Sequence, residues 1–594
     1  MQPDLNLWPI GNCQVSALID SSGRYVWACV PRVDGEPLFS ALLDGDDPQK
    51  GFWDISLEGV VKTETAYLRN TPVLITRHED EAGNAIEVID FCPDYRQRVG
   101  PYRPVAFARI VRPLHGSPRI RVRVRPVTGW SEPVRAKRGV GNYLRFRTGD
   151  VSLRLTMSAP VGIVQEERAF RLESPAYFFL GPDEPFLREI GNAMEGMLES
   201  TVLHWQSWVR GLAIPLEWQS AVIRAAITLK LCQHAETGAI VAALTTSIPE
   251  HHGSQRNWDY RFCWIRDAYY TVQALNRLGA LDVLESYLAF LRNIVDAARG
   301  GHIQPLYGVL GEPDLEERIV PDLAGYRGFG PVREGNQAAR QIQHDAYGQI
   351  VLSSAQAFFD ERLFRPAGEE DFLALERVGQ RAWENYDQPD AGLWELRNSK
   401  WVHTYSSVMC WAACDRLANA AAALGKGDRA RFWQKRANHI RAHIERAAWR
   451  PDSQCFSATF EGEQFDASML QMLDLRFIRP DDSRFLTTLA ALEKQLRRGS
   501  HMLRYASEDD FGLPQTAFNV CTFWLIEALH LTGRTEEARG LFEGILAQRT
   551  PSGLLSEDID PKTGELWGNF PQTYSLVGII NCATLLSRPW STIR

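Results

Sequence analysis

The spacing of apolar residues changes near residue 186, and this change restricts the chain to two structurally different parts. Before it, short runs alternate apolar and polar residues and are separated by Gly, Pro, Asp and Ser, a pattern that predicts strands and turns. In "IRVRVRP", Ile120, Val122 and Val124 share one face, and the arginines are expected on an outward, solvated face rather than in a polyanion site. Regularly spaced short strands without helical patterns predict a β-sandwich over residues 1–185.

Residues 186–214 read as one long amphipathic helix, which we interpret as a linker. Beyond it, residues 215–594 show helical spacing almost throughout. We expect twelve helices, near 216–234, 264–279, 282–297, 336–361, 368–386, 404–423, 427–447, 466–474, 482–496, 515–532, 535–547 and 571–587. Twelve helices in pairs can close into a double ring, so the predicted fold class is an N-terminal β-sandwich followed by a C-terminal (α/α)6 barrel. An α-solenoid would give a similar count, but no repeat signature is found.

Charge and composition narrow the function classes. The chain has 65 Lys and Arg against 73 Asp and Glu, a net charge of −8, which argues against a nucleic-acid partner and fits a small neutral substrate. No segment reads as a membrane span, and "MQPDLNLWPIGNCQ" lacks the pattern of a secretory signal. Ten scattered cysteines without a CxxC pair predict reduced thiols and a cytoplasmic protein. The oligomeric state is left open.

The segments between the predicted helices carry most of the aromatic and charged residues. Five of them are long: "PEHHGSQRNWDYRFCWIRD", "YGVLGEPDLEERIVPDLAGYRGFGPVREGN", "YDQPDAGLWELRNSKW", "HMLRYASEDDFGLPQ" and "SGLLSEDIDPKTGELWGNFPQ". Long ordered loops are usually functional. If alternate helix connections lie at one end of a ring, these loops converge on one pocket.

Two glutamates in these loops are candidate catalytic groups. Glu395 and Glu557 each lie in a Gly-bounded loop before a helix, and paired carboxylates are the minimum equipment for hydrolysing a glycosidic bond. A hydrophobic neighbour such as Trp394 would disfavour the charged form of Glu395, as a proton donor requires. The polar setting of Ser556 and Asp558 would keep Glu557 ionised. From the residues alone, a solvated loop glutamate remains the commoner alternative for each.

The stretch "NWDYRFCWIRD" offers groups that suit a sugar. Arg266 and Asp267 could hold a pair of hydroxyls, with the rings of Tyr260 and Trp264 beside them. The alternatives are a helix-dipole charge for Asp267 and core packing for Trp264.

Other chemistries lack their sequence patterns. The chain has no HExxH motif and no Cys/His set at ligand spacing, so we expect no metal. A GxSxG turn and the GxGxxG and GxxxxGK[ST] nucleotide fingerprints are also absent, and no cofactor is expected.

In chain order, five motifs resemble those of glycoside hydrolase family 15, the glucoamylase and bacterial trehalase family. They are "NWDYRFCWIRDA", "GPVREGNQAARQIQHDAYGQ", "GLWELR", "FGLPQTAFNVCTFWLIEAL" and "GLLSEDID…GELWGNFPQTYSL". The segment "IGNCQVSALIDSSGRYVWACVPRVD" resembles the N-terminal segment of the trehalase-like bacterial branch. The resemblance therefore extends over essentially the whole chain.

This resemblance implies a β-sandwich, an (α/α)6 barrel and exo-acting hydrolysis with inversion at a non-reducing α-glucosyl end. It implies that Glu395 is the general acid and Glu557 the general base. In an inverting enzyme the two carboxyls stand roughly 6.5–9.5 Å apart, to leave room for water. The same resemblance implies substrate-binding roles for Arg266, Asp267, Trp264, Tyr260, Trp394, Arg504, Arg333 and Asn336.

The expected substrate is α,α-trehalose, which would make the chain a trehalase. A glucoamylase or isomaltase type of enzyme, acting on maltose, isomaltose or longer α-glucans, is the alternative. A disaccharide phosphorylase can share this architecture, but phosphate takes over the role of the base there, and Glu557 argues against it. A sugar-binding protein without activity should lack one of the two carboxylates, and both are present.

Overall fold

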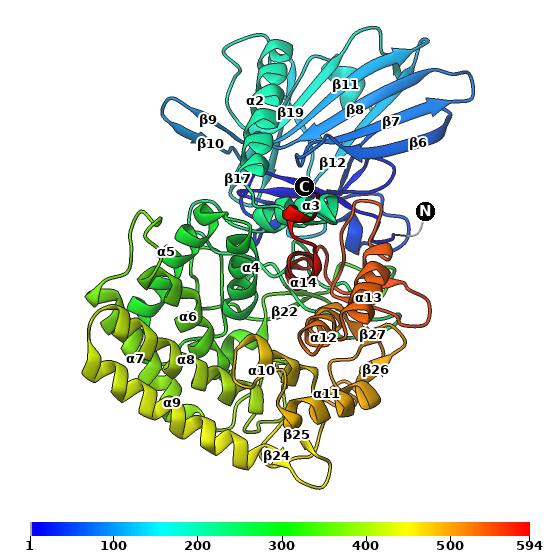
Figure 1. Cartoon of the computed structure of the whole chain (residues 1–594). Coiled ribbons are helices and arrows are strands. Elements are labelled where there is room, and N and C mark those ends of the chain that lie inside the picture. The colour runs from blue at the N-terminus through cyan, green and yellow to red at the C-terminus, as the bar shows by residue number, and fades with distance from the viewer. Residues whose placement is uncertain (1–2, 594) are drawn as a thin grey trace.

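The computed structural model describes residues 3–593, with a strand-rich part followed by a helical part (Figure 1). The long strands end at Pro182 and, apart from the five-residue α1 (Val161–Gln165), the α-helices run from Ile190 onward. This order confirms the predicted fold class. We propose 1–185, 186–214 and 215–594 as the sandwich, linker and barrel segments of the chain.

Two antiparallel sheets form the N-terminal part. The seven-stranded sheet has the order β1-β2-β3-β5-β12-β18 with β4 paired to β3, and consists of β1 (Trp8–Gly11), β2 (Ser16–Ile19), β3 (Tyr25–Val30), β4 (Glu36–Phe39), β5 (Phe52–Leu57), β12 (Arg119–Arg125) and β18 (Phe170–Arg171). The eight-stranded sheet has the order β15-β16-β17-β19-β11-β8-β7-β6, and consists of β6 (Val60–Tyr67), β7 (Leu74–Asp80), β8 (Ala85–Phe91), β11 (Phe107–His115), β15 (Lys137–Arg138), β16 (Tyr143–Thr148), β17 (Val151–Met157) and β19 (Ala176–Pro182). A shared core includes residues from both sheets.

Strand β12 shows how the alternating pattern directs side chains. Ile120 and Val122 are buried between the sheets. The arginines point the other way and pair with carboxylates, as Arg119 does with Glu58 at 2.9 Å. The alternation predicted that the arginines would face outward, and their pairing with carboxylates is an additional feature of this face.

Helix α2 (Ile190–Arg210) follows the sheets and packs against β19 (Figure 1). It buries Gly191, Met194, Thr201, Trp205 and Val209, and its other residues are half-buried or exposed. The buried residues form one stripe, so a single helix is enough to connect the sheets to the barrel.

In the described residues that follow α2, twelve α-helices build the C-terminal part: α3 (Gln219–Leu231), α4 (Ile265–Arg277), α5 (Leu281–Ala298), α6 (Asp345–Ala355), α7 (Glu369–Asn385), α8 (Thr404–Ala423), α9 (Gly427–Ala447), α10 (Gln471–Asp474), α11 (Ser483–Leu496), α12 (Asn519–Leu531), α13 (Thr535–Ala547) and α14 (Thr573–Leu586). An inner ring runs α4, α6, α8, the turn before α10, α12 and α14, and α14 returns to α4. The other helices lie outside it. None of the helices in the described part of the chain combines the length and apolar composition that a bilayer crossing requires.

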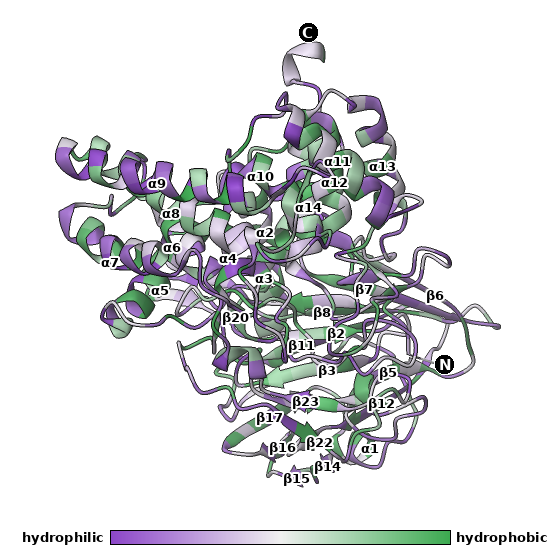
Figure 2. Cartoon of the chain, turned by 90° about the horizontal axis from the view of Figure 1, so that it is seen from below, coloured by the Kyte–Doolittle hydropathy of each residue, from purple (hydrophilic) through white to green (hydrophobic). Residues whose placement is uncertain are grey.

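Burial separates inner from outer helices. Helix α8 is buried along most of its length, whereas α9 buries only Trp433, Ala437, Ile440 and Ile444. That spacing places the four on one stripe, with the charged residues of α9 on the other side. Figure 2 shows hydrophilic residues concentrated on the outer helices α7 and α9. Inner helices need apolar residues all round, and outer helices need only one apolar face.

Two predicted helices are too long, because each includes a 3-10 turn. In 466–474 the turn Ala467–Leu470 precedes α10. The segment 336–361 is a 3-10 turn (Gln337–Arg340), then α6, then a second 3-10 turn (Gln356–Phe358). The backbone is extended at Gln341, where φ is −79° and ψ is 155°, and the amide of His344 donates to the Asp390 carboxylate at 2.8 Å. The apolar periodicity continues through these residues, so the sequence pattern did not show the interruption.

Gly348 permits the close contact between inner helices α6 and α8. A Cβ there would lie 2.4 Å from the carbonyl oxygen of Met409. We expect Gly348→Ala to lower the free energy of unfolding by about 1–3 kcal/mol, because the helices must separate. Gly540→Ala, in open space on α13, is the matched control and should stabilise by up to about 1 kcal/mol. Denaturant unfolding of both variants tests this, and equal shifts would contradict the packing argument.

Candidate active site

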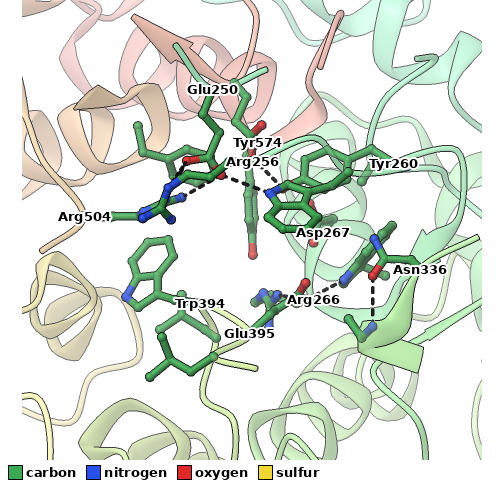
Figure 3. Close-up of a pocket in the computed structure, with 18 of the residues that line it drawn as sticks. Glu250, Arg256, Tyr260, Arg266, Asp267, Asn336, Trp394, Glu395, Arg504 and Tyr574 are labelled. Atoms are coloured by element: carbon green, nitrogen blue, oxygen red, sulfur yellow. Dashed lines mark hydrogen bonds and ion pairs between the residues drawn. The ribbon is translucent and has the colours of Figure 1, made fainter. Parts of the chain in front are cut away.

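A pocket lies where five loops meet, and each loop precedes an inner helix (Figure 3). The lining segments fall within 242–267, 336–341, 393–397, 504–518 and 557–574, before α4, α6, α8, α12 and α14. The five inner helices α4, α6, α8, α12 and α14 therefore begin at one end of the barrel. This confirms the expected convergence of the long aromatic loops.

The structure brings nine of the ten predicted site residues into this pocket. They are Glu395, Glu557, Arg266, Asp267, Trp264, Tyr260, Trp394, Arg504 and Asn336. Arg333 does not line it. The guanidinium of Arg333 pairs with Glu317 at 2.8 Å instead, behind the lining residues.

Glu395 lies in a tight turn whose backbone is strained. Its φ is +60°, in the left-handed region that side chains other than glycine seldom adopt. The turn is closed by the amide of Glu395, which donates to the Gly392 carbonyl at 3.2 Å, and by the Gln341 side chain, which donates to the Glu395 carbonyl at 3.1 Å. At Gly392, a Cβ would lie 2.7 Å from Nε2 of His403. Strain of this kind persists only where neighbours hold the backbone, and it is common at functional sites.

The Glu395 carboxylate accepts two short hydrogen bonds. Trp264 Nε1 donates to it at 2.6 Å and Arg266 Nη2 at 3.0 Å. The Trp394 indole donates instead to Asp466, at 2.7 Å. Gln343 Nε2 also donates to the Glu395 carboxylate, at 3.4 Å, so its hydrogen bonds come from Trp264, Arg266 and Gln343 and none comes from Trp394. The effect of the Trp394 ring on Glu395 stays a prediction.

Arg266 links Glu395 to the start of α6. Its second amino group donates to Gln343 at 2.9 Å and to Asp345 at 3.2 Å. The side chain is buried, with carboxylates on both sides of the guanidinium. A planar fork held at both ends is well oriented for binding hydroxyls.

Glu557 is buried, contrary to the polar setting expected for it. The residue is 1% exposed, and Tyr260 donates its hydroxyl to one carboxylate oxygen at 2.6 Å. The Ser556 hydroxyl donates to the Asp558 carbonyl and not to Glu557. Burial first, and then the negative charge of Glu250, raise the pKa of Glu557 to about 8. The expectation of a polar setting that keeps Glu557 ionised is therefore wrong.

The pKa of Asp267, which lies beside Arg266, is also raised. Burial is the largest effect and raises the pKa of Asp267 to about 7, although the Arg266 charge opposes it. Perturbed carboxyls gathered in one pocket are typical of active sites.

Glu250 was missed in the sequence, although its loop was recognised. It lines the pocket, accepts a hydrogen bond from Trp258 Nε1 at 3.1 Å and pairs with Arg504 at 2.6 Å (Figure 3). Arg256 and Asp509 form another pair of lining residues, and Tyr574 also lines the pocket. These partners lie more than 250 residues apart in two cases, so no local pattern could pair them. Within residues 3–593, no group of His, Cys, Asp and Glu side chains is arranged to hold a metal ion.

Glu557→Gln is expected to stabilise the protein more at alkaline than at acidic pH. The folded protein keeps a proton on Glu557 that the unfolded chain releases, so stability is lost as the pH rises from 4.5 towards about 8. Glutamine removes this loss, and its oxygen can still accept from Tyr260. Between pH values of about 5 and about 9, the variant's gain in unfolding free energy should grow by at least about 1 kcal/mol.

The matched control for this measurement is Glu543→Gln, an exposed position on α13. Its difference from wild type should be independent of pH. Equal pH dependence in both variants, or none at Glu557, would contradict the raised pKa.

Comparison with known proteins identifies the family. The model described as glycosyl hydrolases family 15 matches residues 218–584. A trehalase from Thermoplasma volcanium is 30% identical over 604 residues, covering 97% of this chain and 92% of the relative. A trehalase from Mycobacterium tuberculosis is 30% identical, with 98% and 89% covered. A solved bacterial glucoamylase complexed with acarbose shares the fold, with a TM-score of 0.68 at 12% identity over 98% of this chain and 93% of that chain.

The family match and the pocket concern the same part of the molecule. Residues 218–584 contain all five lining segments, with Glu395 and Glu557 among them. The two trehalases also align over the N-terminal sheets, because the alignments span nearly the whole chain. This chain is a glycoside hydrolase and belongs to glycosyl hydrolases family 15.

Proposed function

We propose that this chain hydrolyses α,α-trehalose to two molecules of glucose, with inversion at the attacked carbon. The observation that carries the proposal is the presence of Glu395 and Glu557 in one pocket of the family-15 region. Trehalose is favoured over glucans because the trehalase relatives match 97–98% of this chain at 30% identity. The similarity to the glucoamylase rests on the fold, at 12% identity.

In the proposed mechanism Glu395, once protonated, donates its proton to the glycosidic oxygen as the bond to the anomeric carbon breaks. A water molecule attacks the opposite face of that carbon and gives its proton to Glu557. Arg266 and Asp267 hold hydroxyls of the glucosyl ring at the buried end of the pocket. Tyr260 holds one oxygen of Glu557, and the other oxygen accepts no hydrogen bond from the described residues. That free oxygen suits a group that must accept a proton.

The raised pKa of Glu557 favours a second assignment, with the roles of Glu395 and Glu557 exchanged. Burial raises the pKa of Glu557, and Tyr260 is the one hydrogen-bond partner of its carboxyl among the described residues. A general acid must carry a proton before it reacts, so the raised pKa of Glu557 fits Glu557 as the acid. The motif positions fit Glu395 as the acid. A substrate that needs no general acid separates the two assignments.

α-Glucosyl fluoride is such a substrate, because fluoride departs without a proton. We expect Glu395→Gln to lower kcat for trehalose by about 100-fold or more, but for the fluoride by less than about 10-fold. Glu557→Gln should lower kcat by about 100-fold or more for both substrates, because a water molecule must attack in each case. The opposite pattern would exchange the roles, and full activity of either variant would remove that residue from the mechanism. Glu543→Gln serves as the unaffected control.

The substrate is tested with the wild-type protein on trehalose, maltose, isomaltose and soluble starch, with and without phosphate. We expect kcat/KM for trehalose to exceed the others by at least about 10-fold, with glucose released in the absence of phosphate. Preference for maltose, isomaltose or starch would assign a glucoamylase or isomaltase activity instead. Formation of glucose 1-phosphate that requires phosphate would assign a phosphorylase.

Cytoplasmic residence is also part of the proposal. All ten cysteines are free and buried, and Cys13, Cys29 and Cys92 show that this holds in the sandwich as well as in the barrel. Free thiols throughout a chain fit a reducing compartment.

A further inference from the structure

The pocket has a buried floor and a partly exposed rim. Trp264 and Asp267 are 2% and 5% exposed, whereas Phe511 is 37% exposed. Phe511 belongs to residues 505–513, which we call the rim loop. Because the buried end is assigned to the glucosyl ring, the rim loop borders the space for the leaving sugar.

The rim loop has a firm attachment on one side of the pocket. Arg256 donates to the Asp509 carboxylate at 2.7 Å and to the Gly512 carbonyl at 2.8 Å. Arg256 itself is buried, in the loop before α4. Phe511 packs edge-on against Trp258, with ring centroids 5.2 Å apart. A charge-assisted pair with a buried arginine holds a loop more tightly than an exposed pair does.

A second attachment joins the rim loop to the loop of Glu395. One oxygen of the Asp510 carboxylate accepts hydrogen bonds from the backbone amides of Arg397, at 2.6 Å, and Asn398, at 3.2 Å. These amides lie two and three residues beyond Glu395. A carboxylate that captures two successive amides fixes the course of that backbone.

Glu395 depends on such support because of its backbone conformation. At φ +60° the residue is strained, and the turn stays in place only if both of its ends are held. Gln341 holds the carbonyl of Glu395, and the amide of Leu396 donates to Ala391 at 3.1 Å. Asp510 holds the chain that leaves the turn. A displacement of about 1 Å in a reacting group can reduce the rate by about 100-fold.

We propose that Asp510 is a positioning residue that couples the rim loop to Glu395, so that the carboxylate is correctly placed only while the rim loop covers the leaving sugar. The inference rests on the proposed function, with Glu395 as the general acid. Glu557 takes its hydrogen bond from Tyr260 and receives none from the rim loop. Asp510 should therefore affect protonation of the leaving group and not the attack of water.

The pair of substrates introduced above separates these steps. We expect Asp510→Ala to lower kcat for trehalose by about 10–100-fold with KM changed by less than about 3-fold, and to lower kcat for α-glucosyl fluoride by less than about 3-fold. Asp510→Asn keeps an oxygen that can accept from both amides and should restore most of the trehalose activity. Glu508→Ala, an exposed position in the same loop, is the matched control and should resemble wild type.

Equal losses on both substrates would overturn the inference, because they would indicate a general structural role. Unchanged trehalose hydrolysis would overturn it as well. Thermal unfolding of each variant checks folding, and Asp510→Ser replaces Asp510→Ala if the latter does not fold. If the wild-type protein cleaves maltose and α-glucosyl fluoride but not trehalose, the proposed substrate is wrong. The role of Asp510 is then tested with maltose in place of trehalose. If the fluoride test exchanges the roles of Glu395 and Glu557, the coupling of Asp510 to the acid is overturned.

Discussion

The common direction of the inner helices is the constraint on which the rest of the structure depends. Each inner helix is buried on nearly all sides, so its ends are the places where polar residues can gather. The loops before α4, α6, α8, α12 and α14 therefore meet at one end, where they make one pocket from segments more than 300 residues apart. The outer helices cover the apolar outer surface of the ring. The loops at the end of the ring are therefore not needed for core packing and can hold catalytic and binding residues.

The pocket concentrates groups that oppose stability. Glu395 has a strained backbone, Asp267 and Glu557 are carboxyls held in a buried environment, and Glu250 is kept in place by Arg504. Unfavourable environments of this kind are retained where reactivity needs them. The rim loop and Gln341 hold the strained turn at Glu395 in place by hydrogen bonds to its backbone.

Much of this was predictable from the sequence, for physical reasons. Period-two and helical spacings follow directly from burial of one face, so the sheets and nearly all of the helices were correctly predicted. The environments of Glu395 and Glu557 were not, because they are set by Trp264, Arg266 and Tyr260 across the pocket. The break before α6 and the pairing of Asp510 with backbone amides also depend on contacts between distant segments.

The anomeric form of the first glucose released from trehalose tests the central claim most directly, because the claim is inversion between two opposed carboxylates. Proton NMR during the first turnovers, before mutarotation, should show α- and β-glucose in equal amounts. The attacked ring leaves as β-glucose, and the departing sugar keeps its α configuration. Release of α-glucose alone would show retention and would contradict the assignment of Glu395 and Glu557 as acid and base.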